Sequence, residues 1–165
     1  MFFTEQIETQ IFSTNQFSYL GLPNSMNYSI DERNCEAAPW ISIQSLLEEC
    51  YPQPPNNVFP LVLSGLLRRQ RIWFAQSENK ILGMVMLSPH SKGGHLENLA
   101  VMPAFRGKGI ASALVLKLIS NVNPDKSVMI SITTRIPLFF EKLGFDHCGI
   151  LNDGSHAMTC LRGPL

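Results

Sequence analysis

The sequence has no excess of charge of either sign. Its 13 lysines and arginines balance 13 aspartates and glutamates, so the formal net charge is zero. A protein that holds nucleic acid through its overall electrostatic field needs a basic surplus, so we expect no nucleic-acid partner. Long hydrophobic runs are missing as well. The stretch at residues 61–67 falls well short of the roughly 20 residues that span a bilayer, which argues against a membrane partner.

Cysteine is scarce and follows no recognisable pattern. The four cysteines, at positions 35, 50, 148 and 160, form no CxxC pair and lack the spacing of zinc ligands. We therefore expect no metal site and four reduced thiols, as is usual in a cytosolic protein. The first ten residues contain Glu5 and Glu8 and no basic leader, unlike a secretory signal. A cytoplasmic location is the expectation that follows.

The length of 165 residues, 45% of them hydrophobic, suits one domain with its own core. We assign residues 1–165 to a single domain, with residues 1–26, which show no clear period, as an N-terminal extension. The pattern predicts strands at residues 27–30, 71–76, 81–87, 95–101, 128–132, 145–151 and 157–161. It predicts helices at residues 39–50, 58–69, 107–121 and 137–143, and a loop at residues 89–94. This order is typical of an α/β chain in which helices flank a mixed central sheet.

The segment Arg106-Gly107-Lys108-Gly109-Ile110-Ala111 joins a predicted strand to a predicted helix. Several backbone N–H groups at a helix start have no partner within the helix, and the helix dipole adds positive potential there. Gly107 and Gly109 let an anion approach the backbone, while Arg106 and Lys108 supply full charges. The segment therefore predicts an anion site suited to a pyrophosphate. It is not a Walker loop, because Ile110 follows the second glycine in place of Lys-Ser/Thr.

Two stretches, taken in order, resemble the two motifs of the GNAT (Gcn5-related) N-acetyltransferases. The first runs from Leu99 to Ala111, and the second is Phe139-Phe140-Glu141-Lys142-Leu143-Gly144-Phe145. The resemblance covers about residues 71–161. It implies the acyl-CoA N-acyltransferase fold, with strands 95–101 and 128–132 splayed apart and the pantetheine arm of acetyl-CoA along residues 99–101. The residues it assigns to acetyl-CoA are Leu99, Ala100, Val101, Arg106, Gly107, Lys108, Gly109, Ile110, Ala111, Phe139 and Lys142.

The same resemblance points to proton transfer on strand 95–101. An alkyl ammonium with a pKa of about 10.4 must lose a proton before it can attack a thioester. Strict alternation would place His95, Glu97, Leu99 and Val101 on one face. The serotonin N-acetyltransferases are similar here, with histidines at both of the first two positions. We expect Glu97 to act as the base or to hold a water, with His95 as its partner. The alternative is that His95 caps the strand and Glu97 pairs with an arginine.

Two details of the second motif bear on the reaction. Many relatives have a tyrosine as general acid where this chain has Phe140, which has no proton to give. The run from Ile132 to Arg135 is similar to the acetyltransferase domain of N-acetylglutamate synthases. That likeness implies that Arg135 binds a substrate carboxylate through its planar fork. The alternative is that Arg135 caps the strand or pairs with Glu141.

Three functions are compatible with these observations. The first is an enzyme that acetylates the primary amine of a small molecule such as an amino acid, by direct transfer in a ternary complex. The second is an acetyl-CoA-binding sensor or scaffold, which Phe140 favours. The third is a protein acetyltransferase acting on a lysine or an N-terminal amine. The sequence leaves a homodimer open.

Overall fold

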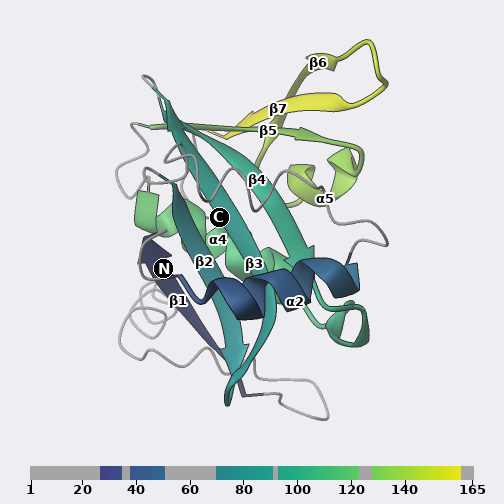
Figure 1. Ribbon diagram of the computed structural model, residues 1–165. Coiled ribbons are helices and arrows are strands. Elements are labelled where there is room, and N and C mark those ends of the chain that lie inside the picture. Colours follow the sequence, from purple (N-terminus) through teal and green to yellow (C-terminus); the bar gives the residue numbers. More distant parts are fainter. Residues whose placement is uncertain (1–26, 35–37, 51–69, 91–92, 123–127, 161–165) are drawn as a thin grey trace, which may run out of the picture.

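The computed structural model describes residues 27–34, 38–50, 70–90, 93–122 and 128–160 (Figure 1). Within these ranges, seven strands form one sheet in the order β1-β2-β3-β4-β5-β7-β6. The strands are β1 (Ser29–Asn34), β2 (Arg71–Ser77), β3 (Lys80–His90), β4 (Gly93–Val101), β5 (Met129–Thr134), β6 (Asp146–Ile150) and β7 (His156–Cys160). The helices are α2 (Trp40–Cys50), α4 (Ile110–Val122) and α5 (Pro137–Glu141), with a short 3₁₀ turn, η3 (Pro103–Phe105).

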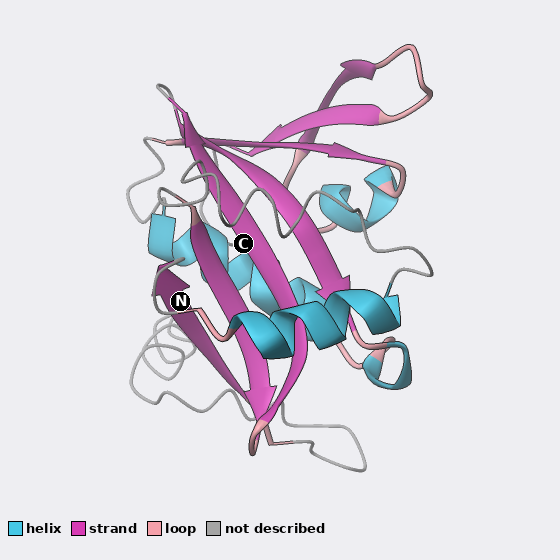
Figure 2. Ribbon diagram, in the orientation of Figure 1, coloured by secondary structure: helices cyan, strands magenta, loops and turns pink. Residues whose placement is uncertain are grey.

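Helices cover both faces of this sheet. Strands β4 and β5 run parallel, and every other neighbouring pair is antiparallel. Helix α2 crosses one face and α4 lies behind the other (Figure 2). The predicted mixed central sheet flanked by helices is therefore confirmed. No helix in the described ranges is both long and apolar enough to cross a bilayer.

Each face has its own apolar core. On the α4 face, Leu114 and Leu118 of the helix pack in one cluster that reaches from Trp73 in β2 to Met158 in β7. On the α2 face, Ile43, Leu46 and Leu47 recur at helical spacing and pack against β2, β3 and the end of β4. The α4 core therefore joins both halves of the sheet, whereas the α2 core ends at β4.

Several predicted boundaries were wrong. The strand predicted at residues 27–30 is β1, which spans Ser29–Asn34. Helix α4 begins at Ile110, not at residue 107, because Gly107 and Gly109 take φ of +74° and +78°. The predicted loop at residues 89–94 is partly strand, with Pro89 paired opposite Gly94. Among the described residues, Pro89 has a partner strand on the β4 side alone, where a proline fits in a sheet. The predicted helix 58–69 and the extension 1–26 lie outside the described residues, as does Cys35. Cys50 and Cys148 are free thiols, as predicted.

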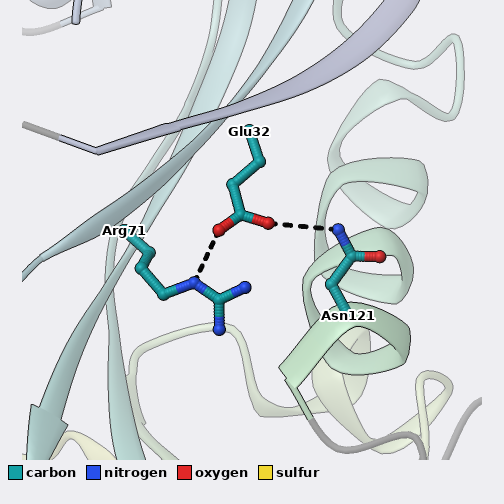
Figure 3. A network of polar contacts seen from close by, with 3 residues as sticks. All are labelled: Glu32, Arg71 and Asn121. Atoms are coloured by element: carbon teal, nitrogen blue, oxygen red, sulfur yellow. Dashed lines mark hydrogen bonds and ion pairs between the residues drawn. The ribbon is translucent and has the colours of Figure 1, made fainter. Parts of the chain in front are cut away.

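A polar network ties the edge strand β1 to the body of the fold (Figure 3). Arg71 Nε donates to Glu32 Oε1 at 2.6 Å, and Asn121 Nδ2 at the end of α4 donates to Glu32 Oε2 at 3.3 Å. The Arg71 guanidinium also lies over the Trp73 ring, 4.9 Å from its centroid. Burial alone would raise the pKa of Glu32, but the hydrogen bond and charge of Arg71, together with Asn121 and Lys117, lower it.

We predict that Glu32→Gln lowers the free energy of unfolding by about 0.5–1 kcal/mol at pH 7, as expected for a partly exposed ion pair. The folded pKa lies below the ordinary value of about 4.5, so this stabilisation is complete above that pH and is lost as the pH falls through the folded pKa. Urea unfolding at pH 7 and pH 3 measures both values. Asp31→Asn, on the same strand but exposed, is the control. An equal effect of Glu32→Gln at both pH values would contradict the charge argument.

Candidate active site

The sheet opens between its two parallel strands. Strands β4 and β5 pair only at Gly93↔Met129, Gly94↔Ile130 and His95↔Ser131. Their close approach needs Gly93, since a Cβ there would lie 1.8 Å from the Met129 carbonyl oxygen. From Leu96 onward, the described part of the chain gives β4 a partner strand on its β3 side alone. The opening expected between these strands is therefore present and starts directly after His95.

A bulge in β4 changes which side chains share a face. Met86 pairs with Glu97 but Met84 pairs with Ala100, so two residues of β4 stand opposite Val85. Asn98, inside the bulge, has φ of +50°. Before the bulge, His95 and Glu97 share one face of the sheet, as the predicted alternation requires.

The predicted alternation was wrong beyond the bulge. Glu97 and Ala100 lie on the α2 face through their pairing with Met86 and Met84, whereas Leu99 and Val101 pack into the α4 core. The extra residue shifts the side-chain period by one, as a β-bulge does. The backbone of residues 97–101 therefore bends at the point where the neighbouring strand has departed.

Polar partners hold the two candidate catalytic residues. His95 Nδ1 lies 2.9 Å from Ser131 Oγ across the β4–β5 pair. Gln70 Nε2, just before β2, donates to Ser88 Oγ at 2.6 Å and to Glu97 Oε2 at 3.4 Å. Ser88 is itself the register partner of His95. His95 and Glu97 thus lie half-buried on the α2 face, within a group of polar side chains from four segments. Sequence reasoning found both residues but neither Gln70 nor Ser131.

The loop predicted to bind an anion lies at the other end of β4. Apart from its chain neighbours, a Cβ built on Gly107 or Gly109 would meet no atom of the described residues within 4 Å, and the residues from Arg106 to Gly109 are exposed. Ala113 N donates to Gly109 O at 3.0 Å, which is the first turn of α4. Open space above a helix start with positive-φ glycines fits a phosphate group. The residues present therefore suit the pyrophosphate of coenzyme A.

Gly83 explains how the helix start comes so close to the sheet. A Cβ on this β3 residue would lie 2.9 Å from Ala100 O and 3.3 Å from Ile110 Cγ2. Any side chain there would push the first residue of α4 away from β4. No sequence motif singled out this glycine.

Two basic residues of the loop region have specific contacts. Arg106 Nε donates to Val101 O at 3.0 Å, so this guanidinium braces the loop against the end of β4. Lys108 Nζ lies 5.3 Å from the centroid of the Phe105 ring, and Lys80 Nζ, from the β2–β3 turn, lies 5.8 Å from it. Lys80 therefore adds positive charge beside the loop, which sequence reasoning missed because the residue lies 26 positions before Arg106.

Cys50 joins helix α2 to the same end of β4. Its thiol lies 3.3 Å from Val101 O, the carbonyl oxygen that also accepts from Arg106. Burial raises the pKa of the Cys50 thiol, and the nearby Arg106 offsets part of this effect. The thiol is accordingly a neutral contact that fixes the end of α2.

The second motif forms helix α5 and the turn after it. Phe140 is only 2% exposed and packs between the rings of Phe139 and Phe145, with centroids 4.9 and 5.4 Å away. Gly144, in the turn that follows the helix, has φ of +88°. Phe139 is half-buried and Lys142 is exposed. Phe140 is thus a core residue as well as one without a proton to donate.

Arg135 follows the end of β5 beside the turn that joins β6 and β7. Its NH2 lies 3.9 Å from Asp153 Oδ2, and the two side chains are 77% and 61% exposed. Hydrogen bonds from Ser155 are the main cause of a lowered pKa at Asp153, and Arg135 adds to it. Arg135 therefore pairs with Asp153 and not with Glu141, which the alternative interpretation had named as its partner. An ion pair this long and this exposed contributes little energy, so it leaves Arg135 available to a ligand.

Comparisons with known proteins agree with this geometry. A family model described as the acetyltransferase (GNAT) domain matches residues 68–147. The human N-acetylaspartate synthetase is 29% identical over 110 residues, which are 62% of this chain. The chain matches only 32% of the length of that relative.

Solved structures share the fold. An aminoglycoside 6'-N-acetyltransferase complexed with coenzyme A has a TM-score of 0.66 at 19% identity, covering 79% of this chain and 94% of that one. The ribosomal-protein-S18-alanine N-acetyltransferase from Escherichia coli has a TM-score of 0.65 at 16% identity, covering 79% and 92%. The predicted acyl-CoA N-acyltransferase fold is confirmed by these similarities.

We predict that Gly109→Val weakens coenzyme A binding at least about tenfold. A branched side chain disfavours the positive φ and fills the open space above the helix start. Titration calorimetry with acetyl-CoA measures the affinity. Gly154→Val is the matched control, because Gly154 has φ of +79° and open space around it but lies in the β6–β7 turn. Unchanged affinity in Gly109→Val, or an equal loss in both variants, would contradict the loop as the phosphate site.

Proposed function

We propose that this chain is an acetyltransferase of the GNAT family, whose domain model matches residues 68–147, and that it transfers an acetyl group from acetyl-CoA to the primary amine of a small molecule, in a ternary complex. The observation that carries the proposal is the opening between β4 and β5. It has the anion-binding loop at one end and the pair His95 and Glu97 at the other. One β-strand thus leads from a phosphate site to two proton acceptors.

The residues that would hold acetyl-CoA come from β4 and the start of α4. The backbone of Leu99–Val101 offers hydrogen-bonding groups along an edge that no strand covers, as in recognition by strand addition. The loop from Arg106 to Ala111 would hold the pyrophosphate through its N–H groups, with positive charge from Lys108 and Lys80. Phe139 and Lys142 would flank the same opening from α5. Acetyl-CoA supplies a reactive thioester, and these residues of the chain would hold that thioester in place.

Removal of a proton from the acceptor amine falls to Glu97, with His95 as its partner. Glu97 accepts a hydrogen bond from Gln70, which fixes its carboxylate on the α2 face. A carboxylate in this position takes the proton directly or holds a water that does. Phe140 has no proton to donate and is buried, so no general acid acts from that position.

An amino acid is the acceptor class that we propose. Arg135 is exposed at the end of β5, and its guanidinium suits bidentate binding of a carboxylate. The name of the curated relative, N-acetylaspartate synthetase, supports an amine that also carries carboxylates. The two structural neighbours are named for other acceptors, an aminoglycoside and the alanine of a ribosomal protein. The fold alone therefore does not determine the acceptor.

Phe140 favours a second candidate function, a sensor that binds acetyl-CoA without turnover. Calorimetric titration of acetyl-CoA, followed by a thiol-release assay against amino acids, polyamines and a lysine peptide, separates the candidates. Binding with thiol release for amino acids supports the proposal. Release for the peptide alone would indicate a protein acetyltransferase. Binding without release for any acceptor would support the sensor.

We predict that Glu97→Gln lowers kcat by about 100-fold or more while the affinity for acetyl-CoA stays within about twofold. The amide retains the shape of the side chain but cannot accept the proton. Steady-state kinetics and calorimetry measure the two values. Glu48→Gln, an exposed glutamate on α2, is the control. Normal kcat in Glu97→Gln would make Glu97 structural.

We predict that Arg135→Met raises KM for an amino-acid acceptor about tenfold, since it removes a charged hydrogen-bond partner, and leaves KM for a polyamine unchanged. Arg33→Met, on the opposite edge of the sheet, is the control for loss of one positive charge. Asp153→Asn, which releases Arg135 from its ion pair, should lower KM for the amino acid. An equal effect of Arg135→Met on both acceptor classes would contradict a carboxylate site.

A further inference from the structure

Ser131 stands at the point where the sheet opens. It is the β5 partner of His95 in the final β4–β5 pair, so both side chains lie on the same face. Its hydroxyl contacts two groups at once: His95 Nδ1 at 2.9 Å and the Gly94 carbonyl oxygen at 3.4 Å. Both contacts come from β4, so this hydroxyl bridges the two strands where their backbone pairing ends.

One assignment of hydrogens satisfies both contacts of Ser131 at once. A carbonyl oxygen can only accept, so the contact between Ser131 and Gly94 uses the single hydroxyl hydrogen. The lone pairs of Ser131 Oγ then face His95 Nδ1, which must carry a hydrogen to make its bond. A neutral imidazole has one N–H, and placing it on Nδ1 leaves Nε2 as the acceptor. Among the described residues, His95 Nε2 makes no hydrogen bond.

We propose that Ser131 is a positioning residue that holds His95 in the Nδ1–H tautomer and so presents Nε2 as a second proton acceptor beside the Glu97 carboxylate. His95 and Glu97 are two residues apart on one face, about 7 Å along the strand, close enough to serve one amine through a water. The acceptor ammonium gives its proton to this pair, becoming a neutral amine, and the proton then passes to solvent. This inference rests on the proposed function.

The tautomer can be measured without turnover. Long-range ¹H–¹⁵N correlation spectra of the ¹⁵N-labelled protein distinguish a protonated from an unprotonated ring nitrogen, and the signals lost in His95→Gln identify His95. The spectra are taken near pH 8.5, above the ordinary histidine pKa of about 6.5. We expect the Nδ1–H form in the unaltered chain and a shift toward the Nε2–H form in Ser131→Ala. An Nε2–H form in the unaltered chain would overturn the proposal.

Kinetics test the consequence. Ser131→Ala should lower kcat about tenfold with acetyl-CoA affinity unchanged, and should have no further effect in a His95→Ala background. Ser131→Thr keeps the hydroxyl and should restore both the tautomer and kcat. Ser120→Ala, which removes a hydroxyl bonded to a helix carbonyl 2.9 Å away, is the matched control. An equal loss from Ser131→Ala in the His95→Ala background would make Ser131 merely structural.

The two experiments keep this inference separate from the proposed function. If no acceptor is acetylated, the proposed function fails, and the spectra still decide which tautomer Ser131 selects. If acetylation occurs but Ser131→Ala changes neither the tautomer nor kcat, the positioning role fails and the proposed function stands.

Discussion

The structure depends on the shortness of the pairing between β4 and β5. Three residue pairs hold these parallel strands together, and beyond them the strands part. A longer pairing would close the sheet and leave no open edge on β4. No pairing at all would separate the half of the sheet that carries α5 from the half that carries α2. The opening exists because the α4 core continues beneath both halves and supports them where the backbone pairing has ended.

The division of polar and apolar side chains follows from the same opening. On the α2 face, the apolar core ends at β4. Beyond it lies a patch of polar side chains that extends across the sheet from Gln70, beside β2, to Ser131 on β5. Buried polar groups are stable only when hydrogen-bonded, and these side chains bond to one another. The half-buried His95 and Glu97 are therefore held in defined positions while still reached from outside. The two side chains are therefore rigidly placed and also accessible to a substrate.

The sequence was sufficient for the glycine turn before α4 and for the order of the described elements, because both depend on local signals. Gly107 and Gly109 before an apolar helix predict a phosphate site wherever the chain folds. The bulge at Asn98 was missed, since φ of +50° at an asparagine leaves no mark in a hydrophobic pattern. Asp153 and Ser131 were missed for another reason. They reach Arg135 and His95 through strand pairings that only the folded sheet creates.

Gly93 has a consequence for how this architecture diversifies. Where the strands join, the glycine lies against the Met129 carbonyl so closely that backbone alone sets the separation. Side chains farther along the opening have no part in that spacing. They can therefore be exchanged over evolutionary time without altering the width between the strands. The same sheet backbone can in this way serve acceptors of different size and charge. A new specificity needs changes only in the side chains that face the opening.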